Sequence, residues 1–226
     1  MAEAVAHPGS LMLASWGIGL LALRQGDLAR ALPMLERAVG ICDEADLPVY
    51  FPGIAAALGA AYTLGRRLVD AVPLLMQARE QSAATARAHV EALCHRALGE
   101  AYVLAGRLEE GHVLAQQALA LAHGRQERDN QTYVLYLFGD IATRRDPPEV
   151  EPAKAYYQQS LALAEALGMR PLQAHCHRSL GTLYATTGQQ EQARTALSTA
   201  IAMYQSMEMP FWLPQTAAAL AQVEGR

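Results

Sequence analysis

A repeat of about 40 residues is the strongest constraint on how this sequence can fold. Five glycines, each following a large apolar residue, stand 40, 40, 40 and 42 residues apart at Gly19, Gly59, Gly99, Gly139 and Gly181. Small residues recur at two further positions in every unit, namely Ala31 and Ala38, Ala71 and Ala78, Gly111 and Ala118, Ala153 and Ser160, and Ala193 and Ala200. A fixed period of about 20 to 50 residues is typical of proteins built from stacked structural repeats.

Each unit is expected to form two helices joined by a turn. A glycine turn signal separates two periodic stretches in four of the units, and a proline-rich loop at 146–152 takes its place in the fourth unit. Apolar residues flank the turns at spacings of three and four, as in Leu28, Leu32, Leu35 and Val39, which predicts amphipathic helices. Two such helices cannot cover their own apolar faces, so neighbouring pairs must stack. The pattern predicts an all-α solenoid of about five helix pairs with a closing C-terminal helix.

The predicted solenoid fills the chain as a single domain, 1–226. Its units are expected at 10–47, 48–86, 87–125, 126–169 and 170–209, with the closing helix at 211–224. Pro33 and Pro73 occupy the same phase of two second helices, near enough to the first turn to be tolerated. The small residues are expected where helices cross closely, so a leucine at Gly59 or Ala78 should overpack the crossing.

The repeated positions resemble the tetratricopeptide repeat, TPR. Two units match that motif best, through Gly99, Tyr102, Gly106 and Ala118 in the third and Gly181, Tyr184, Gly188, Ala193 and Ala200 in the fifth. The period is longer than that of the family, the proline that normally ends the second helix is absent, Arg66 replaces a glycine, and Gly111 replaces an alanine. The resemblance implies a right-handed α-solenoid of TPR-like helix pairs whose first helices line a concave groove.

A narrower resemblance concerns the phrases QGDLARALPMLERA and LGMRPLQAHCHRSLGTLYATTGQQEQA, the latter followed by FWLPQ. These phrases are similar to the C-terminal TPR tail of bacterial signalling ATPases that carry an adenylate/guanylate cyclase-type domain. The resemblance implies that the chain is the regulatory TPR part of a larger signalling protein. The chain itself has no Walker-type glycine loop.

The charge balance and the apolar pattern exclude several classes of partner. Acidic residues outnumber basic ones by 22 to 18, whereas nucleic-acid binders usually carry a basic surplus, so we expect no nucleic acid. The longest apolar run, 11–23, is shorter than the roughly 20 residues of a membrane-spanning helix, so we expect no membrane. The first ten residues contain Glu3 and no lysine or arginine, unlike a signal peptide. Because Cys42, Cys94 and Cys176 form no disulfide framework, we expect a cytoplasmic protein.

The resemblance also assigns a binding surface. The spacing of residues along the first helices predicts which side chains face the groove. Those expected to contact a partner are Arg96, Glu100, Tyr133, Tyr136, Asp140, Arg144, His175, Arg178 and Gln222. Arginine and tyrosine dominate interface energetics, and arginine can clamp a carboxylate or an acidic peptide. The alternative is that these are ordinary solvated residues, with the arginines paired to Glu100 and Asp140.

The N-terminal end of the same stripe is apolar, with Leu13, Trp16 and Leu20. Three interpretations remain open for this patch. It binds a partner in the groove, it joins two copies of the chain in a homodimer, or it is buried beneath residues 1–10.

No constellation in the sequence predicts catalysis or a bound metal. The sequence His175-Cys176-His177 does not converge on one ion, because adjacent residues on a helix point about 100° apart. We expect no enzyme activity, no cofactor and no metal. The predicted function is a scaffolding module that binds a peptide or protein in its groove; the alternatives are a self-associating structural module and a small-molecule sensor.

Overall fold

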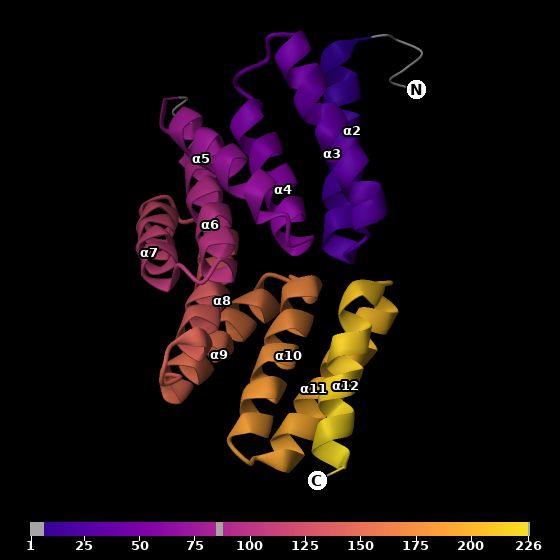
Figure 1. Ribbon diagram of the computed structural model, residues 1–226, viewed down its shortest axis with the longest axis vertical. Coiled ribbons are helices and arrows are strands. Elements are labelled where there is room, and N and C mark those ends of the chain that lie inside the picture. The colour runs from indigo at the N-terminus through magenta and orange to yellow at the C-terminus, as the bar shows by residue number, and fades with distance from the viewer. Residues whose placement is uncertain (1–6, 85–87, 226) are drawn as a thin grey trace. The chain divides into compact units, whose positions relative to one another are not determined.

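The computed structural model describes residues 7–84 and 88–225, and every regular element within them is a helix (Figure 1). They divide into two compact units, Met1–Gln126 and Glu127–Arg226. The first unit contains α2 (Pro8–Gln25), α3 (Leu28–Glu44), α4 (Phe51–Leu64), α5 (Leu68–Ala84), α6 (Ala88–Leu104) and α7 (Leu108–Gly124). The second contains α8 (Arg128–Arg144), α9 (Val150–Ala166), α10 (Arg170–Thr186), α11 (Gln190–Ser206), the short 3₁₀ helix η1 (Pro210–Trp212) and α12 (Leu213–Glu224).

The helices pack as successive pairs. In the first unit α2 packs on α3, α4 on α5 and α6 on α7, while α3 also contacts α4 and α5 contacts α6. In the second unit α8 packs on α9 and α10 on α11, with α9 against α10 and α11 against α12. The predicted all-α fold of five helix pairs and a closing helix is confirmed. The two compact units meet in sequence where the third and fourth repeats were expected to meet, and the assignment of 1–226 to one domain stays a prediction.

The small residues lie where the two helices of a pair cross. A Cβ atom placed on Gly19 would lie 2.6 Å from Cγ of Leu35, and one on Gly181 would lie 2.7 Å from Cγ of Leu197. In the fourth repeat the contacting side chain is Tyr157, whose Cδ1 would lie 2.6 Å from a Cβ on Gly139. Each glycine therefore accommodates a large side chain of the second helix, which explains the period of the sequence.

Four of the five turns between paired helices contain a residue in the left-handed conformation. Gly26, Gly106 and Gly188 have φ of 75°, 80° and 77°, a region that glycine enters without steric cost. In the second repeat the glycine falls one residue earlier, so Gly65 has an ordinary negative φ and Arg66 takes φ of 58°. Because Arg66 replaces the glycine of the TPR motif, an arginine takes a backbone conformation that is unfavourable for any residue with a Cβ atom.

Replacing Arg66 by glycine should stabilise the chain. A left-handed conformation costs a non-glycine residue about 1–2 kcal/mol, and the entropy of glycine in the unfolded state offsets part of the gain. We expect Arg66→Gly to raise the free energy of unfolding by about 0.5–1 kcal/mol in urea titrations. Gly106→Arg is the matched reverse change and should lower it. Equal stability of Arg66→Gly and the wild type would contradict this assignment of strain.

None of the described helices combines the length and the apolar character needed to cross a lipid bilayer.

Candidate functional site

A hydrogen-bonded cluster of tyrosine, arginine and serine joins α8 to α10 in the second unit. The Tyr136 hydroxyl on α8 lies 2.9 Å from Oγ of Ser179 on α10. Arg178, the neighbouring residue on α10, donates from Nη2 to the same hydroxyl at 3.3 Å. Tyr136 is therefore held between the two first helices of neighbouring pairs, and its phenol orients the guanidinium of Arg178.

One turn after Tyr136, α8 presents the carboxylate of Asp140. The Tyr157 hydroxyl on α9 donates to Oδ1 of Asp140 at 2.7 Å, and the Tyr136 and Tyr157 rings pack with their centroids 5.4 Å apart. Burial raises the pKa of Tyr136 to about 12, with a further contribution from the negative charge of Asp140. Burial and then Asp140 also raise the pKa of Tyr157. Both phenols therefore keep their protons at neutral pH and remain hydrogen-bond donors.

His175 extends the cluster towards the C-terminus. Its Nδ1 lies 2.7 Å from the Tyr204 hydroxyl of α11, and its ring packs against Trp212 of η1 with a centroid distance of 4.7 Å. Burial and, to a smaller extent, the positive charge of Arg178 together lower the pKa of His175 to about 3. The imidazole is therefore neutral at physiological pH and serves as a packed hydrogen-bonding group.

Arg178 contributes a fixed positive charge to this cluster. Burial lowers its pKa, but Tyr136 and Tyr204, followed by Asp140, raise the pKa above its ordinary value. In the described part of the chain, Tyr136 is the one hydrogen-bond partner of the half-buried guanidinium, and no carboxylate forms an ion pair with it. A guanidinium has five N–H donors, so most of the donors of Arg178 remain available to a ligand. Such an arrangement suits a carboxylate, which accepts two parallel hydrogen bonds.

The structure brings four of the predicted groove residues together, namely Tyr136, Asp140, His175 and Arg178. Tyr133 lies on the same helix as Tyr136 and packs against Ala164, Leu172 and Cys176. Arg144 is exposed at the end of α8, and Gln222 is exposed on α12. These last two residues do not join the cluster through any of the contacts above.

The other two predicted groove residues belong to the first unit. Arg96 and Glu100 lie one turn apart on α6 and form an ion pair there. The sequence analysis gave such pairing with a carboxylate as the alternative interpretation of the groove arginines. Arg178 differs from Arg96 in this respect, because no ion pair joins it to a carboxylate among the described residues.

Two residues of the predicted apolar patch, Trp16 and Leu20, are partly buried against one core cluster, and the third is exposed. Both pack on a cluster formed by α2, α3 and α4, and a Cβ on Gly53 of α4 would lie 3.1 Å from Cη2 of the Trp16 ring. Leu13 is exposed. Burial beneath residues 1–10 involves residues 1–6, which lie outside the described residues, and the three interpretations of the patch stay predictions.

The sequence analysis missed the residues that complete the cluster from other elements, namely Tyr157 of α9, Tyr204 of α11 and Trp212 of η1. Tyr157 occupies the position that contacts the repeated glycine, where three other repeats have Leu35, Leu75 and Leu197. A polar aromatic residue at a position otherwise held by leucine was the available signal. Trp212 gave no such signal, because its place beside His175 depends on how η1 packs against the helices.

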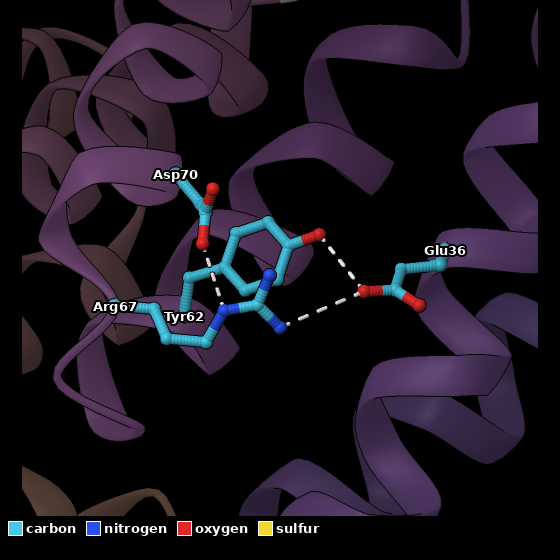
Figure 2. A network of polar contacts seen from close by, with 4 residues as sticks. All are labelled: Glu36, Tyr62, Arg67 and Asp70. Carbon is cyan, nitrogen blue, oxygen red and sulfur yellow. Dashed lines mark hydrogen bonds and ion pairs between the residues drawn. The ribbon is translucent and has the colours of Figure 1, made fainter.

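A second polar network, also unforeseen, lies in the first unit (Figure 2). The Tyr62 hydroxyl donates to Oε1 of Glu36 at 2.9 Å, and Arg67 stacks 4.3 Å above the Tyr62 ring while its Nε donates to Asp70 at 2.8 Å. The third repeat has the same spacing, with Arg107 3.7 Å above Tyr102 and hydrogen-bonded to Glu110. Because these charged groups are exposed, each pair contributes little to stability, about 0–1 kcal/mol.

Metal and thiol chemistry find no support among the described residues. No group of three or more histidine, cysteine, aspartate or glutamate side chains in 7–84 and 88–225 is placed to hold a metal ion. The three cysteines are buried and free. Burial raises the pKa of both Cys94 and Cys176 to about 12, so these groups remain protonated thiols.

A tetratricopeptide repeat family model matches residues 151–206, which cover nearly all of α9 and the whole of α10 and α11. This segment contains Tyr157, His175, Arg178 and Tyr204 of the cluster. No curated protein sequence matches the chain.

Several solved structures share the fold. A Rap protein complexed with Competence and Sporulation Factor aligns with a TM-score of 0.79 at 13% identity, over 95% of this chain and 63% of that chain. NprR in complex with its cognate peptide NprX aligns at 0.73 and 19% identity, over 96% and 60% of the two chains. A putative kinesin light chain from Podosopora anserina with nearly identical TPR-like repeats aligns at 0.53 and 19% identity, over 89% and 98%.

The chain spans less than two thirds of the length of the Rap and NprR chains. At these identities the likeness concerns the fold. The chain therefore has the fold of TPR-like helical repeat proteins, and its residues 151–206 match the TPR family model itself.

Proposed function

We propose that this chain is a peptide- or protein-binding module and that the cluster around Arg178 is its recognition site. The observation that supports this proposal is the half-buried guanidinium of Arg178, which has a single hydrogen-bond partner among the described residues. Among the described residues, no nitrogen of Arg178 is both buried and without a partner, so its unused donors are open to solvent or to a ligand. Two proteins of similar fold were solved with a bound factor or a cognate peptide.

The chemistry of the cluster suggests what the ligand presents. Arg178 offers donors to a carboxylate, either an acidic side chain or a C-terminus. Asp140, fixed by Tyr157, offers an acceptor to a peptide N–H or a basic side chain. Tyr133 and Tyr136 supply aromatic surface of the kind that is enriched at interfaces. A peptide with an acidic group beside an apolar side chain fits these features best.

The wider context follows the resemblance seen in the sequence. We propose that the module is the TPR part of a larger signalling protein, works in the cytoplasm without a cofactor and catalyses no reaction. The neutral state of His175 supports the last point, since a histidine with a pKa of about 3 is a poor general base near neutral pH. A small-molecule sensor remains the alternative for the same cluster.

Fluorescence anisotropy with a panel of labelled acidic peptides tests this function. Each peptide is prepared with a free C-terminal carboxylate and as the amide, and is titrated with the full chain. We expect at least one peptide to bind, and Arg178→Gln to weaken that binding by about 10- to 100-fold, because a charge-assisted hydrogen bond contributes about 1.5–3 kcal/mol.

Two further variants make the result specific. Arg194→Gln removes an exposed arginine of α11 that pairs with Glu191 and should leave the affinity unchanged. Arg178→Lys keeps the charge and should lose less affinity than Arg178→Gln. Absence of binding by every peptide would refute the function, and full affinity in a folded Arg178→Gln variant would refute the site.

A further inference from the structure

Ser179 of α10 places a hydroxyl group at a position that is apolar in the other repeats. Two residues before the repeated glycine, the first four units have Gly17, Ala57, Ala97 and Leu137. Ala57, Ala97 and Leu137 are buried, whereas Ser179 is half-buried and lies 2.9 Å from a hydroxyl group of α8. The fifth unit therefore has a polar group between two first helices at a position where the other units have an apolar residue.

The hydrogen bonds around Ser179 run in one direction. Arg178 donates to the Tyr136 hydroxyl at 3.3 Å, so the phenol oxygen accepts from the guanidinium and its own hydrogen remains to be donated. Burial raises the pKa of Tyr136 to about 12, so the phenol retains that hydrogen. A phenol is more acidic than an alcohol, and the bond that it receives from Arg178 strengthens it further as a donor. The phenol therefore donates to Oγ of Ser179.

The hydrogen of the Ser179 hydroxyl is then left without an acceptor. In the ranges 7–84 and 88–225, Tyr136 is the single hydrogen-bond partner of Ser179. A serine hydroxyl both accepts and donates, and accepting from Tyr136 leaves its own hydrogen unused. The Thr182 hydroxyl of the same helix differs, because it donates to the backbone carbonyl of Arg178 at 2.9 Å. A half-buried donor of this kind is satisfied by solvent or by a ligand.

We infer that Ser179 is a second ligand-binding residue of the Arg178 site and that it donates its hydroxyl hydrogen to the same carboxylate that Arg178 binds. The inference rests on the proposed function and adds a contact to it. Arg178 Nη2 and Ser179 Oγ lie 3.3 and 2.9 Å from one atom, the Tyr136 hydroxyl oxygen. A carboxylate beside that hydroxyl can accept from the guanidinium with one oxygen and from the serine with the other. The pair of donors therefore favours a carboxylate over a primary amide, which has one acceptor oxygen.

Anisotropy titrations with the labelled acidic peptides test this contact. Each peptide is compared with forms in which one carboxylate, in a side chain or at the C-terminus, is replaced by its amide. We expect Ser179→Ala to weaken binding of the carboxylate form by about tenfold and binding of the amide form by less than about threefold, because the lost hydrogen bond joins a charged group. The preference of the site for the carboxylate should therefore decrease.

Tyr136→Phe separates a direct contact from an effect that passes through the phenol. If Ser179 contacts the ligand, Ser179→Ala should weaken binding of the carboxylate form by a similar factor in the wild type and in the Tyr136→Phe background. If Ser179 only orients Tyr136, the substitution should have no effect once the phenol hydroxyl is absent. That result would overturn the inference.

Two further variants control for the loss of a serine. Ser179→Thr keeps the hydroxyl and should retain most of the preference for the carboxylate, while Ser198→Ala removes an exposed serine of α11 and should bind like the wild type. Urea unfolding establishes that every variant is folded. Unchanged affinity in Ser179→Ala, or an equal loss for the carboxylate and amide forms, would overturn the inference and leave the proposed function intact. Absence of binding by every peptide to the wild type would refute both.

Discussion

Gly59→Leu is expected to lower the free energy of unfolding by about 1–3 kcal/mol or more, among the largest effects of any single change in the first unit. A Cβ atom on Gly59 would lie 2.5 Å from Cδ2 of Leu75, so even alanine forces the Leu75 side chain to shift. The rest of a leucine side chain has no free volume there, because Leu75 and Leu58 are buried. Urea unfolding monitored by circular dichroism measures the loss.

The same crossing provides a control and a rescue. Gly40→Leu adds the same side chain at a glycine of α3 whose Cβ would meet nothing within 4 Å, so it should cost nothing and gain from helix propensity. Leu75→Ala alone should cost about 2–5 kcal/mol. Leu75 occupies the space that a leucine at position 59 needs. Leu75→Ala in the Gly59→Leu background should therefore restore stability. A double variant less stable than both single variants would contradict this account.

Acid should destabilise the second unit through His175. The folded pKa is about 3 and the ordinary value is 6.5, so between these values the unfolded chain takes up a proton that the folded chain refuses. Stability is therefore complete above pH 6.5 and falls as the pH decreases towards 3. From pH 6.5 to pH 5 the loss is about 2 kcal/mol, at about 1.4 kcal/mol per pH unit.

His175→Gln should remove this part of the pH dependence, which urea unfolding at pH 7 and pH 5 measures. Burial also lowers the pKa of His177, so His177→Gln should remove a further part. His123→Gln, at an exposed position of α7, is the matched control and should unfold with the pH dependence of the wild type. An NMR titration of His175 with a midpoint near pH 6.5 would contradict the burial of a neutral imidazole.

The helix pairs could be predicted from sequence because one physical contact repeats. A glycine or alanine in the first helix must face a large side chain in the second, and Gly19 with Leu35 illustrates the spacing that results. Because the two contacting residues lie on different helices of a pair, the number of residues between them fixes where the turn falls and how long the helices are. The turn at Arg66 shows how local the signal is, since a shift of one residue moves the left-handed conformation onto a non-glycine residue.

The candidate site could be predicted only for residues that share a helix face. Tyr136 and Arg178 fall on one predicted stripe, and they are hydrogen-bonded in the structure. Tyr157 and Trp212 come from other elements, and their contacts depend on tertiary packing that periodicity does not encode. At the N-terminus, spacing alone did not show that Trp16 and Leu20 are partly buried against one core cluster while Leu13 is exposed, because that difference depends on how α4 packs.

The most direct test of the proposed function is a binding cycle between Arg178 and the carboxylate of a peptide that binds. Dissociation constants are measured for the acid and the amide forms of that peptide, each with the wild type and with Arg178→Gln. The account predicts that amidation weakens binding to the wild type at least about tenfold but scarcely affects binding to Arg178→Gln, a coupling of about 1.5–3 kcal/mol. An equal loss on amidation in both proteins would contradict a recognition site centred on Arg178.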